Sequence, residues 1–92
     1  MKIKVENMTS NNGNKIANQF ILKGNDFCIF QSYDSVIVKK VYKKGNTTIY
    51  LDERFWDYSC TTGKYRNIFL GETKKDTERK IASGQYKLAD LN

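Results

Sequence analysis

Three carboxylates are the one group whose types and spacing could support catalysis. Asp52, Glu53 and Asp57 lie close together in the sequence. If the segment Leu51–Tyr58 formed a helix, Glu53 and Asp57 would share a face at i and i+4, where paired carboxylates can divide acid and base roles or hold Mg²⁺. The alternative is a strand end or helix start that carries solvated acids, some of them paired with neighbouring Lys and Arg side chains. Because the spacing identifies no third ligand, we expect neither a catalytic residue nor a metal site here.

The rest of the composition also argues against an enzyme. The chain contains no histidine, so it lacks the commonest general base, the commonest zinc ligand and any Ser-His or Cys-His pair. Cys28 and Cys60 are too few to form a zinc site alone, and no glycine-rich phosphate loop of a known pattern is present. We therefore expect a non-enzymatic protein that needs no cofactor.

The stretch Leu51–Leu70 has the richest aromatic content of the chain and includes the only tryptophan, Trp56. Its aromatic and arginine side chains have the composition of a protein-binding hot spot. The same rings could instead form the core of the domain, and residue types alone leave both alternatives open. The candidate partner-binding residues are Arg54, Phe55, Trp56, Tyr58, Tyr65 and Arg66.

A second candidate site is a basic hairpin. The net charge is +6, and most of the excess lies in the first half of the chain. Lysines that surround an aromatic ring can combine attraction for phosphates with stacking on bases. The alternative is that lysines on turns and edge strands keep sheets from pairing with one another and keep the protein soluble. The candidate nucleic-acid-binding residues are Lys39, Lys40, Tyr42, Lys43 and Lys44.

Alternating and β-branched runs predict the strands that carry these sites. Met1–Asn7 has the period-2 pattern of an edge strand. Ala17–Lys23 and Asp26–Tyr33 form a predicted hairpin around Gly24-Asn25, and Ser35–Tyr42 and Thr47–Leu51 form a second one around Lys43–Asn46. These short connections require antiparallel neighbours.

After Leu51 the period becomes helical. A helix capped by Thr61 or Thr62 should end at Gly71, and a second helix over Lys74–Ser83 should begin with a cap formed by Thr73 and Asp76. The tail Gln85–Leu91 returns as a short strand or lies against the sheet. The fold class predicted is α+β, an antiparallel meander of four to five strands with two short C-terminal helices on one face.

Length and hydropathy place these elements in one domain over residues 1–92. No apolar run is long enough for a transmembrane helix, and the N-terminus lacks the apolar stretch of a signal peptide, so we expect a cytoplasmic protein with no membrane contact. In that reducing compartment both cysteines should be free thiols. The oligomeric state stays open between a monomer and a homodimer, since an edge strand can pair across a two-fold axis.

Several segments carry a resemblance to a known group of proteins. They are WDYSCTTGKYRNIFLGET at Trp56–Thr73, KIASGQY at Lys80–Tyr86, DLN at Asp90–Asn92, NQFI at Asn18–Ile21 and FQSY at Phe30–Tyr33. Over residues 14–92 the chain resembles a family of small uncharacterised proteins carried by phages and plasmids of Gram-positive bacteria. The resemblance implies an accessory protein in the cytoplasm of a host bacterial cell, a context in which inhibitors of host immunity such as anti-CRISPR proteins occur, along with DNA-associated factors.

Two functions follow as expectations. The first is a non-enzymatic phage or mobile-element accessory protein that binds and inhibits a host defence component, either a protein or a nucleoprotein complex, in the manner of an anti-CRISPR protein. The alternative is a basic accessory protein that binds nucleic acid. DNA mimicry is disfavoured, because a mimic needs a strongly acidic face and this chain is basic.

Overall fold

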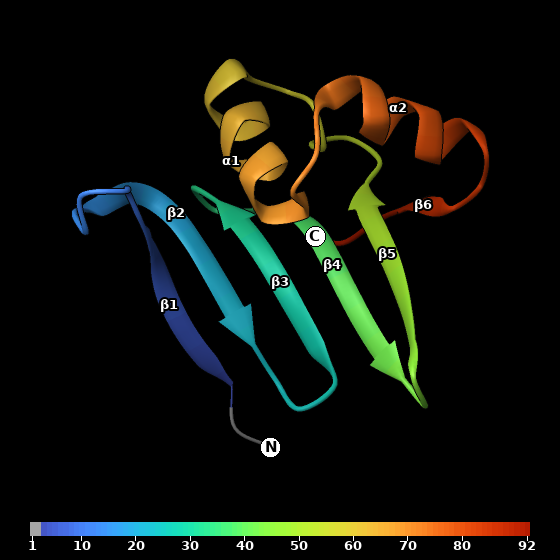
Figure 1. The fold of residues 1–92 in the computed structure, drawn as a ribbon, viewed down its shortest axis with the longest axis horizontal. Coiled ribbons are helices and arrows are strands. Elements are labelled where there is room, and N and C mark those ends of the chain that lie inside the picture. Colours follow the sequence, from blue (N-terminus) through green and yellow to red (C-terminus); the bar gives the residue numbers. More distant parts are fainter. Residues whose placement is uncertain (1–2) are drawn as a thin grey trace.

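A computed structural model describes residues 3–92, in which one six-stranded sheet carries two helices (Figure 1). The α+β class with two C-terminal helices is confirmed, while the number of strands is six rather than four to five. The first two residues of the predicted strand Met1–Asn7 lie outside the described residues. The elements are β1 (Lys4–Thr9), β2 (Lys15–Lys23), β3 (Phe27–Ser32), β4 (Ser35–Lys43), β5 (Asn46–Asp52), α1 (Cys60–Leu70), α2 (Lys74–Ala82) and β6 (Tyr86–Ala89).

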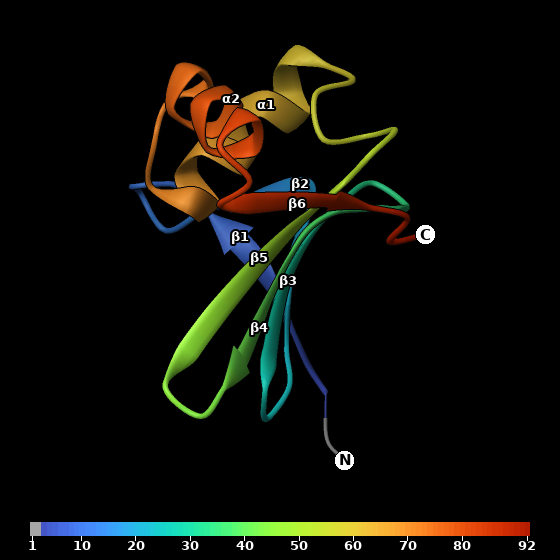
Figure 2. The same cartoon turned by 90° about the vertical axis from the view of Figure 1, so that its right-hand side faces the viewer.

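The first five strands form the predicted antiparallel meander, in the order β1-β2-β3-β4-β5. At the β2–β3 turn, a Cβ on Gly24 would lie 2.2 Å from a ring carbon of Phe27, so any other residue there would force the Phe27 ring to move. At the β4–β5 turn, Lys44 and Gly45 both have positive φ, 45° and 82°. Two positive φ values in a two-residue loop match the twist of a hairpin. Both turns project from the end of the sheet opposite the helices (Figures 1 and 2).

The sixth strand departs from the meander, because β6 runs parallel to β5 with Tyr86 opposite Ile49 and Leu88 opposite Leu51. Between β5 and β6 the chain passes through both helices and returns in the same direction, which is how parallel neighbours are connected. The tail therefore does return as a strand. Its parallel pairing depends on the path of the helices, which local sequence patterns do not encode.

The helix boundaries largely follow the predicted caps. Gly71 ends α1 in the left-handed conformation with φ 70°, and Thr73 and Asp76 form a capping box at the start of α2. The start of α1 is different, because Ser59 rather than a threonine is the N-cap and its Oγ accepts from the backbone N–H of Thr62 at 3.1 Å. Thr62 is fully buried and its Oγ1 bonds Ser32 on β3 at 2.9 Å. It thus anchors the helix to the sheet instead of capping it.

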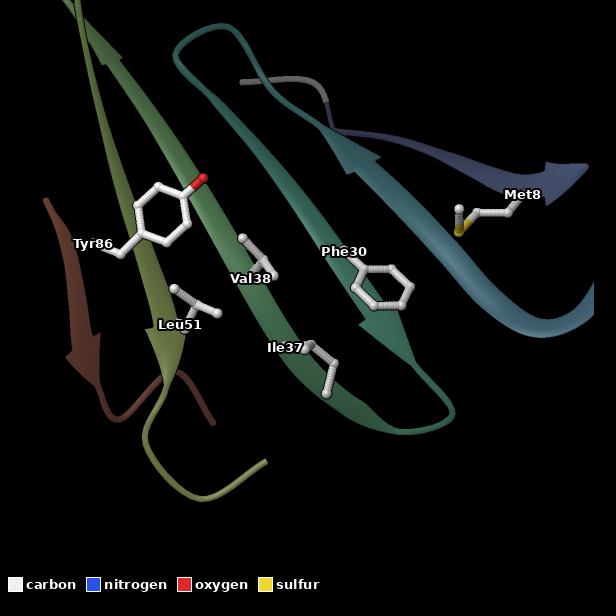
Figure 3. Packing of buried hydrophobic residues seen from close by; sticks show 6 residues of the cluster. All are labelled: Met8, Phe30, Ile37, Val38, Leu51 and Tyr86. Carbon is white, nitrogen blue, oxygen red and sulfur yellow. The ribbon is translucent and has the colours of Figure 1, made fainter. Parts of the chain in front are cut away.

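The core lies between the helices and one face of the sheet. Phe30 on β3 stacks on Phe69 of α1 with ring centres 5.7 Å apart. Figure 3 shows the buried cluster on the strands. Its members are Met8, Phe30, Ile37, Val38, Leu51 and Tyr86. Both helices pack on the same side of the sheet (Figure 2), as predicted.

Gln19 is a polar side chain in this core. It is fully buried beside β3, and neither its amide nitrogen nor its amide oxygen has a hydrogen-bond partner. An unpaired buried amide costs free energy. We expect Gln19→Met, which preserves the length of the side chain, to raise the unfolding free energy by about 1 kcal/mol, measured as a higher Tm. A lower Tm than wild type would show that the amide is hydrogen-bonded in solution.

Glu72 connects α2 to β6. Its carboxylate accepts from the Tyr86 hydroxyl at 2.6 Å, from Lys80 Nζ at 2.7 Å and from Thr77 Oγ1 at 2.6 Å. Burial alone would raise the pKa of Glu72, but the hydrogen bonds from these donors outweigh it and hold the pKa below its ordinary value. Burial and the neighbouring carboxylate raise the pKa of Tyr86 to about 12. The cluster is therefore stable only as a carboxylate with a neutral phenol.

We expect Glu72→Gln to lower the unfolding free energy by about 2 kcal/mol near neutral pH, because three donors lose their charged acceptor. A lowered folded pKa means that this stability is present above the ordinary value of 4.5 and is lost as the pH falls through the folded pKa. The difference between wild type and variant should therefore shrink in acid. Urea unfolding followed by Trp56 fluorescence over a range of pH values measures it.

Tyr86→Phe is the matching variant for alkaline pH. Since the pKa of this phenol rises from 10.0 to about 12 on folding, wild type should lose more stability than the variant as the pH rises through that interval. For the acid range, the relevant comparison is between wild type and Glu72→Gln. If the difference in their unfolding free energies stayed constant as the pH fell, the role of the carboxylate charge would be contradicted.

Candidate functional site

The segment between β5 and α1, Glu53–Ser59, carries much of the predicted partner-binding set and is called the aromatic loop below. Asp52, fully buried at the end of β5, fixes its start. Its Oδ2 accepts from the backbone N–H groups of Arg54 at 3.0 Å and Phe55 at 2.9 Å, and its Oδ1 accepts from that of Leu91 at 2.9 Å. Burial would raise the pKa of Asp52, but these bonds lower it. Asp52 therefore serves as a backbone cap.

Arg66 of α1 fixes the other end of the aromatic loop. Its side chain is only 1% exposed. Its Nη1 donates to the Trp56 carbonyl at 2.6 Å and to Asp57 Oδ1 at 3.2 Å, and its Nη2 donates to Asn67 Oδ1 at 3.0 Å. The guanidinium also lies 5.2 Å from the centre of the Trp56 ring. Arg66 thus holds the loop against the helix from inside.

The six predicted partner-binding residues consequently have different environments. Arg54 and Tyr58 are exposed, the Arg54 side chain at 58% and Tyr58 at 45%. Phe55, Trp56 and Tyr65 are partly buried and pack against the core cluster. Arg66 is internal and does not reach the surface. The group therefore contains both core residues and surface residues. Only the exposed side chains of Arg54 and Tyr58 are positioned to touch a partner directly.

The three carboxylates do not form a common acidic site. The segment that holds them is a strand end followed by turns, so Glu53 and Asp57 are not on one helical face. Asp57 accepts from Lys74 Nζ at 2.7 Å in addition to Arg66. Burial would raise the pKa of Asp57, but Lys74 and Arg66 outweigh it and lower the pKa. Within residues 3–92, no cluster of three or more His, Cys, Asp or Glu side chains could hold a metal ion.

An open cleft of about 490 Å³ lies between the aromatic loop and α1. Asp57 and Tyr58 form its loop side, Gly63 and Lys64 form its α1 side, and Lys74 contributes from α2. The cleft is therefore bordered by an exposed aromatic ring and two exposed lysines, next to a loop whose backbone is fixed.

The other face of the sheet carries no helix and is called the bare face below. Residues paired across neighbouring strands lie on the same face, and successive residues along a strand alternate between faces. Since Phe30, Val38 and Leu51 pack under the helices, their strand neighbours belong to the bare face. Ile37 is the exception, because the register shifts there and its side chain is buried in the core cluster. Among the residues that the register assigns to the bare face are Val5, Phe20, Leu22, Phe27, Ile29, Val36, Lys39, Val41, Lys43, Tyr50 and Lys87.

The five predicted nucleic-acid-binding residues do not share one surface. Lys39 and Lys43 lie on the bare face, and Lys44 is in the turn. Lys40 lies on the helix side, where its Nζ donates to the Phe69 carbonyl at 3.2 Å and lies 4.4 Å from the centre of that ring. Tyr42 lies on the same side as Lys40. Period-2 alternation along β4 would have separated Lys39 from Lys40 on the sequence alone.

Sequence reasoning also missed two of the residues that surround Lys39, namely Phe27 and Lys87. Together with Tyr50, a tyrosine near the predicted basic hairpin, they come from three other strands, and the register brings them onto the same face. The Lys39 Nζ lies 5.8 Å from the centre of the Phe27 ring. The pattern of each strand gives the face within that strand, but only the register shows which residues become neighbours.

These features define an α+β protein whose five-stranded meander is extended by a parallel strand after two helices. The chain belongs to a family of unknown function (DUF8033), which it matches over residues 3–84. The match includes β1, which lies before the region of the resemblance described above. No curated protein and no solved structure matches the chain. None of the helices within residues 3–92 is long and apolar enough to cross a membrane.

The role of Arg66 can be tested by removing its charge while keeping an apolar stem. We expect Arg66→Met to lower the unfolding free energy by about 3 kcal/mol, because it leaves a buried carbonyl and Asn67 without their donor. Urea unfolding followed by circular dichroism measures the loss. The matched control is Lys74→Met, which removes only the exposed partner of Asp57 and should cost less than about 1 kcal/mol. Equal losses for the two variants would contradict an internal role for Arg66.

Proposed function

We propose that the protein works without catalysis, as an accessory protein of a phage or other mobile element that binds and inhibits a host defence component in the bacterial cytoplasm. It acts as anti-CRISPR proteins do, by occupying a functional surface of its target. The observation that carries this proposal is the aromatic loop, which presents Arg54 and Tyr58 outward while buried groups fix its backbone. The mobile-element context comes from the resemblance described above.

A fixed loop of this composition suits protein binding for two reasons. Tyrosine, tryptophan and arginine are enriched among the few residues that contribute most of the binding energy at protein interfaces. A loop already ordered by Asp52 and Arg66 loses little further entropy when it binds, so more of the contact energy appears as affinity. The cleft beside Tyr58 adds a concave surface into which a side chain of the partner can project.

The carboxylates support an enzymatic function less well than the aromatic loop supports binding. Asp52 is saturated by backbone N–H groups and Asp57 is held by Arg66 and Lys74. A general acid or base must reach a substrate with a free oxygen, and neither side chain offers one without breaking a contact that orders the loop. Binding is thus the function that the geometry supports best.

The test is a double variant, Arg54→Ala with Tyr58→Ala. Because both side chains are exposed, we expect the Tm to change by no more than a few degrees, while inhibition falls by roughly tenfold or more. The measurement is the plating efficiency of a phage on bacteria that carry one defence system each and express the wild-type or variant protein.

The matched control is Arg79→Ala with Tyr42→Ala, which removes the same residue types elsewhere on the surface. Arg79 is 71% exposed and pairs with Asp76, much as Arg54 pairs with Asp90, and Tyr42 is 43% exposed. This control should inhibit like wild type. If wild type restored phage growth against none of the defence systems, inhibition would be wrong; if the loop variant inhibited like wild type, the aromatic loop would not be the binding site.

A further inference from the structure

The bare face is basic, and no helix within residues 3–92 covers it (Figure 2). The register aligns one row of side chains across all six strands: Val5, Leu22, Ile29, Lys39, Tyr50 and Lys87. The row is apolar over β1–β3 and carries lysines around an aromatic ring over β4–β6. Phe27 and Lys43 extend the second part along β3 and β4.

The charge on this face has one sign. Its charged strand residues within the described chain are Lys15 on β2, Lys39 and Lys43 on β4 and Lys87 on β6, apart from Asp52. The carboxylate of Asp52 is 0% exposed and bonded to backbone N–H groups, so it does not offset the lysines at the surface. On the helix side, by contrast, the strand lysines Lys4 and Lys23 both pair with Glu6. The bare face therefore lacks the intramolecular counter-ions that the helix side has.

We propose that the bare face over β3–β6 binds single-stranded nucleic acid. Lysines without counter-ions attract phosphates, and exposed ring faces on a sheet stack on unpaired bases. Phe27 and Tyr50, both partly exposed, supply the rings. Lys39 lies between them, 5.8 Å from the Phe27 ring centre and directly opposite Tyr50. Lys87 is the neighbour of Tyr50 on its other side. Rings and cations thus alternate across the sheet at the spacing of neighbouring strands, about 5 Å.

Two other occupants fit this surface less well. Two copies packed face to face over β3–β6 would bring three lysines from each chain together with no exposed strand carboxylate to oppose them. A nucleic-acid duplex presents its phosphates but keeps its bases stacked inside, so it would leave Phe27 and Tyr50 without partners. A single strand offers phosphates to the lysines and unpaired bases to the rings.

This inference does not rest on inhibition of host defence, because the surface that it uses is separate from the exposed side chains of the aromatic loop. It also differs from binding by the basic hairpin predicted from the sequence. Lys39 and Lys43 belong to both sites, but Lys40 and Tyr42 face the helix side and should not matter. Phe27, Tyr50 and Lys87 should matter instead.

The experiment is a titration of fluorescein-labelled oligothymidylate of about 20 nucleotides, followed by fluorescence anisotropy. Three phosphate contacts predict a salt slope of about −2, so the affinity should fall about 20-fold between roughly 50 and 200 mM salt. A duplex of the same length should bind more weakly. Lys39→Gln and Lys87→Gln should each weaken binding several-fold, and Tyr50→Ala by roughly tenfold, with Tyr50→Phe restoring it.

The matched controls are Lys75→Gln on α2 and Tyr42→Ala on the helix side, both exposed and both expected to bind like wild type. No binding at the lower salt concentration would overturn the proposal, as would a Lys75→Gln variant that loses as much affinity as Lys87→Gln. A dimer in solution that Leu22→Lys dissociates would assign the face to a second copy and also overturn it. A Lys39→Gln variant that lost oligonucleotide binding but still inhibited host defence would leave the proposed function intact.

Discussion

The buried guanidinium of Arg66 is the interaction on which the arrangement of the C-terminal half depends. Through Trp56 and Asp57 it fixes the aromatic loop, and through Asp57 it is linked to Lys74 at the start of α2. One cation thus connects the loop with both helices. Three acceptors replace water at its two terminal nitrogens, and two of them are neutral oxygens, whereas its buried Nε has no hydrogen-bond partner among the described residues. The loop is therefore ordered without regular secondary structure of its own.

A second constraint is that, within residues 3–92, the two helices cover one face of the sheet. Both helices pack over Phe30 and the buried cluster, and the five-stranded meander is completed by β6 rather than by a second layer. The two faces of the sheet therefore differ both in whether helices cover them and in the partners of their lysines. On the helix side the Lys40 ammonium donates to the backbone carbonyl of Phe69 in α1 and lies over the ring of the same residue. On the bare face its neighbour Lys39 has only aromatic and apolar side chains beside it.

Local signals predicted what local geometry determines. Gly24 and Gly45 located both hairpins because their backbone positions exclude or disfavour side chains, and Thr73 with Asp76 located the start of α2. Interactions between distant residues escaped prediction. Examples are the parallel direction of β6, the burial of Arg66 and the placement of Phe27 and Tyr50 on one face. All three depend on the strand register and on the path of the helices, and no single segment of the sequence encodes either. An arginine inside an aromatic stretch is equally typical of a surface and of an internal anchor.

The two candidate surfaces meet on β5, and this connection bears on what kind of target would use both. Tyr50 belongs to the bare face, and two residues later Asp52 caps the aromatic loop. Two residues of a strand span about 7 Å, so one ligand could contact both surfaces. A free oligonucleotide would engage only the bare face, and a free protein chiefly the loop. A nucleoprotein with an exposed strand would engage both, and its affinity would exceed that of either component because the second contact becomes intramolecular.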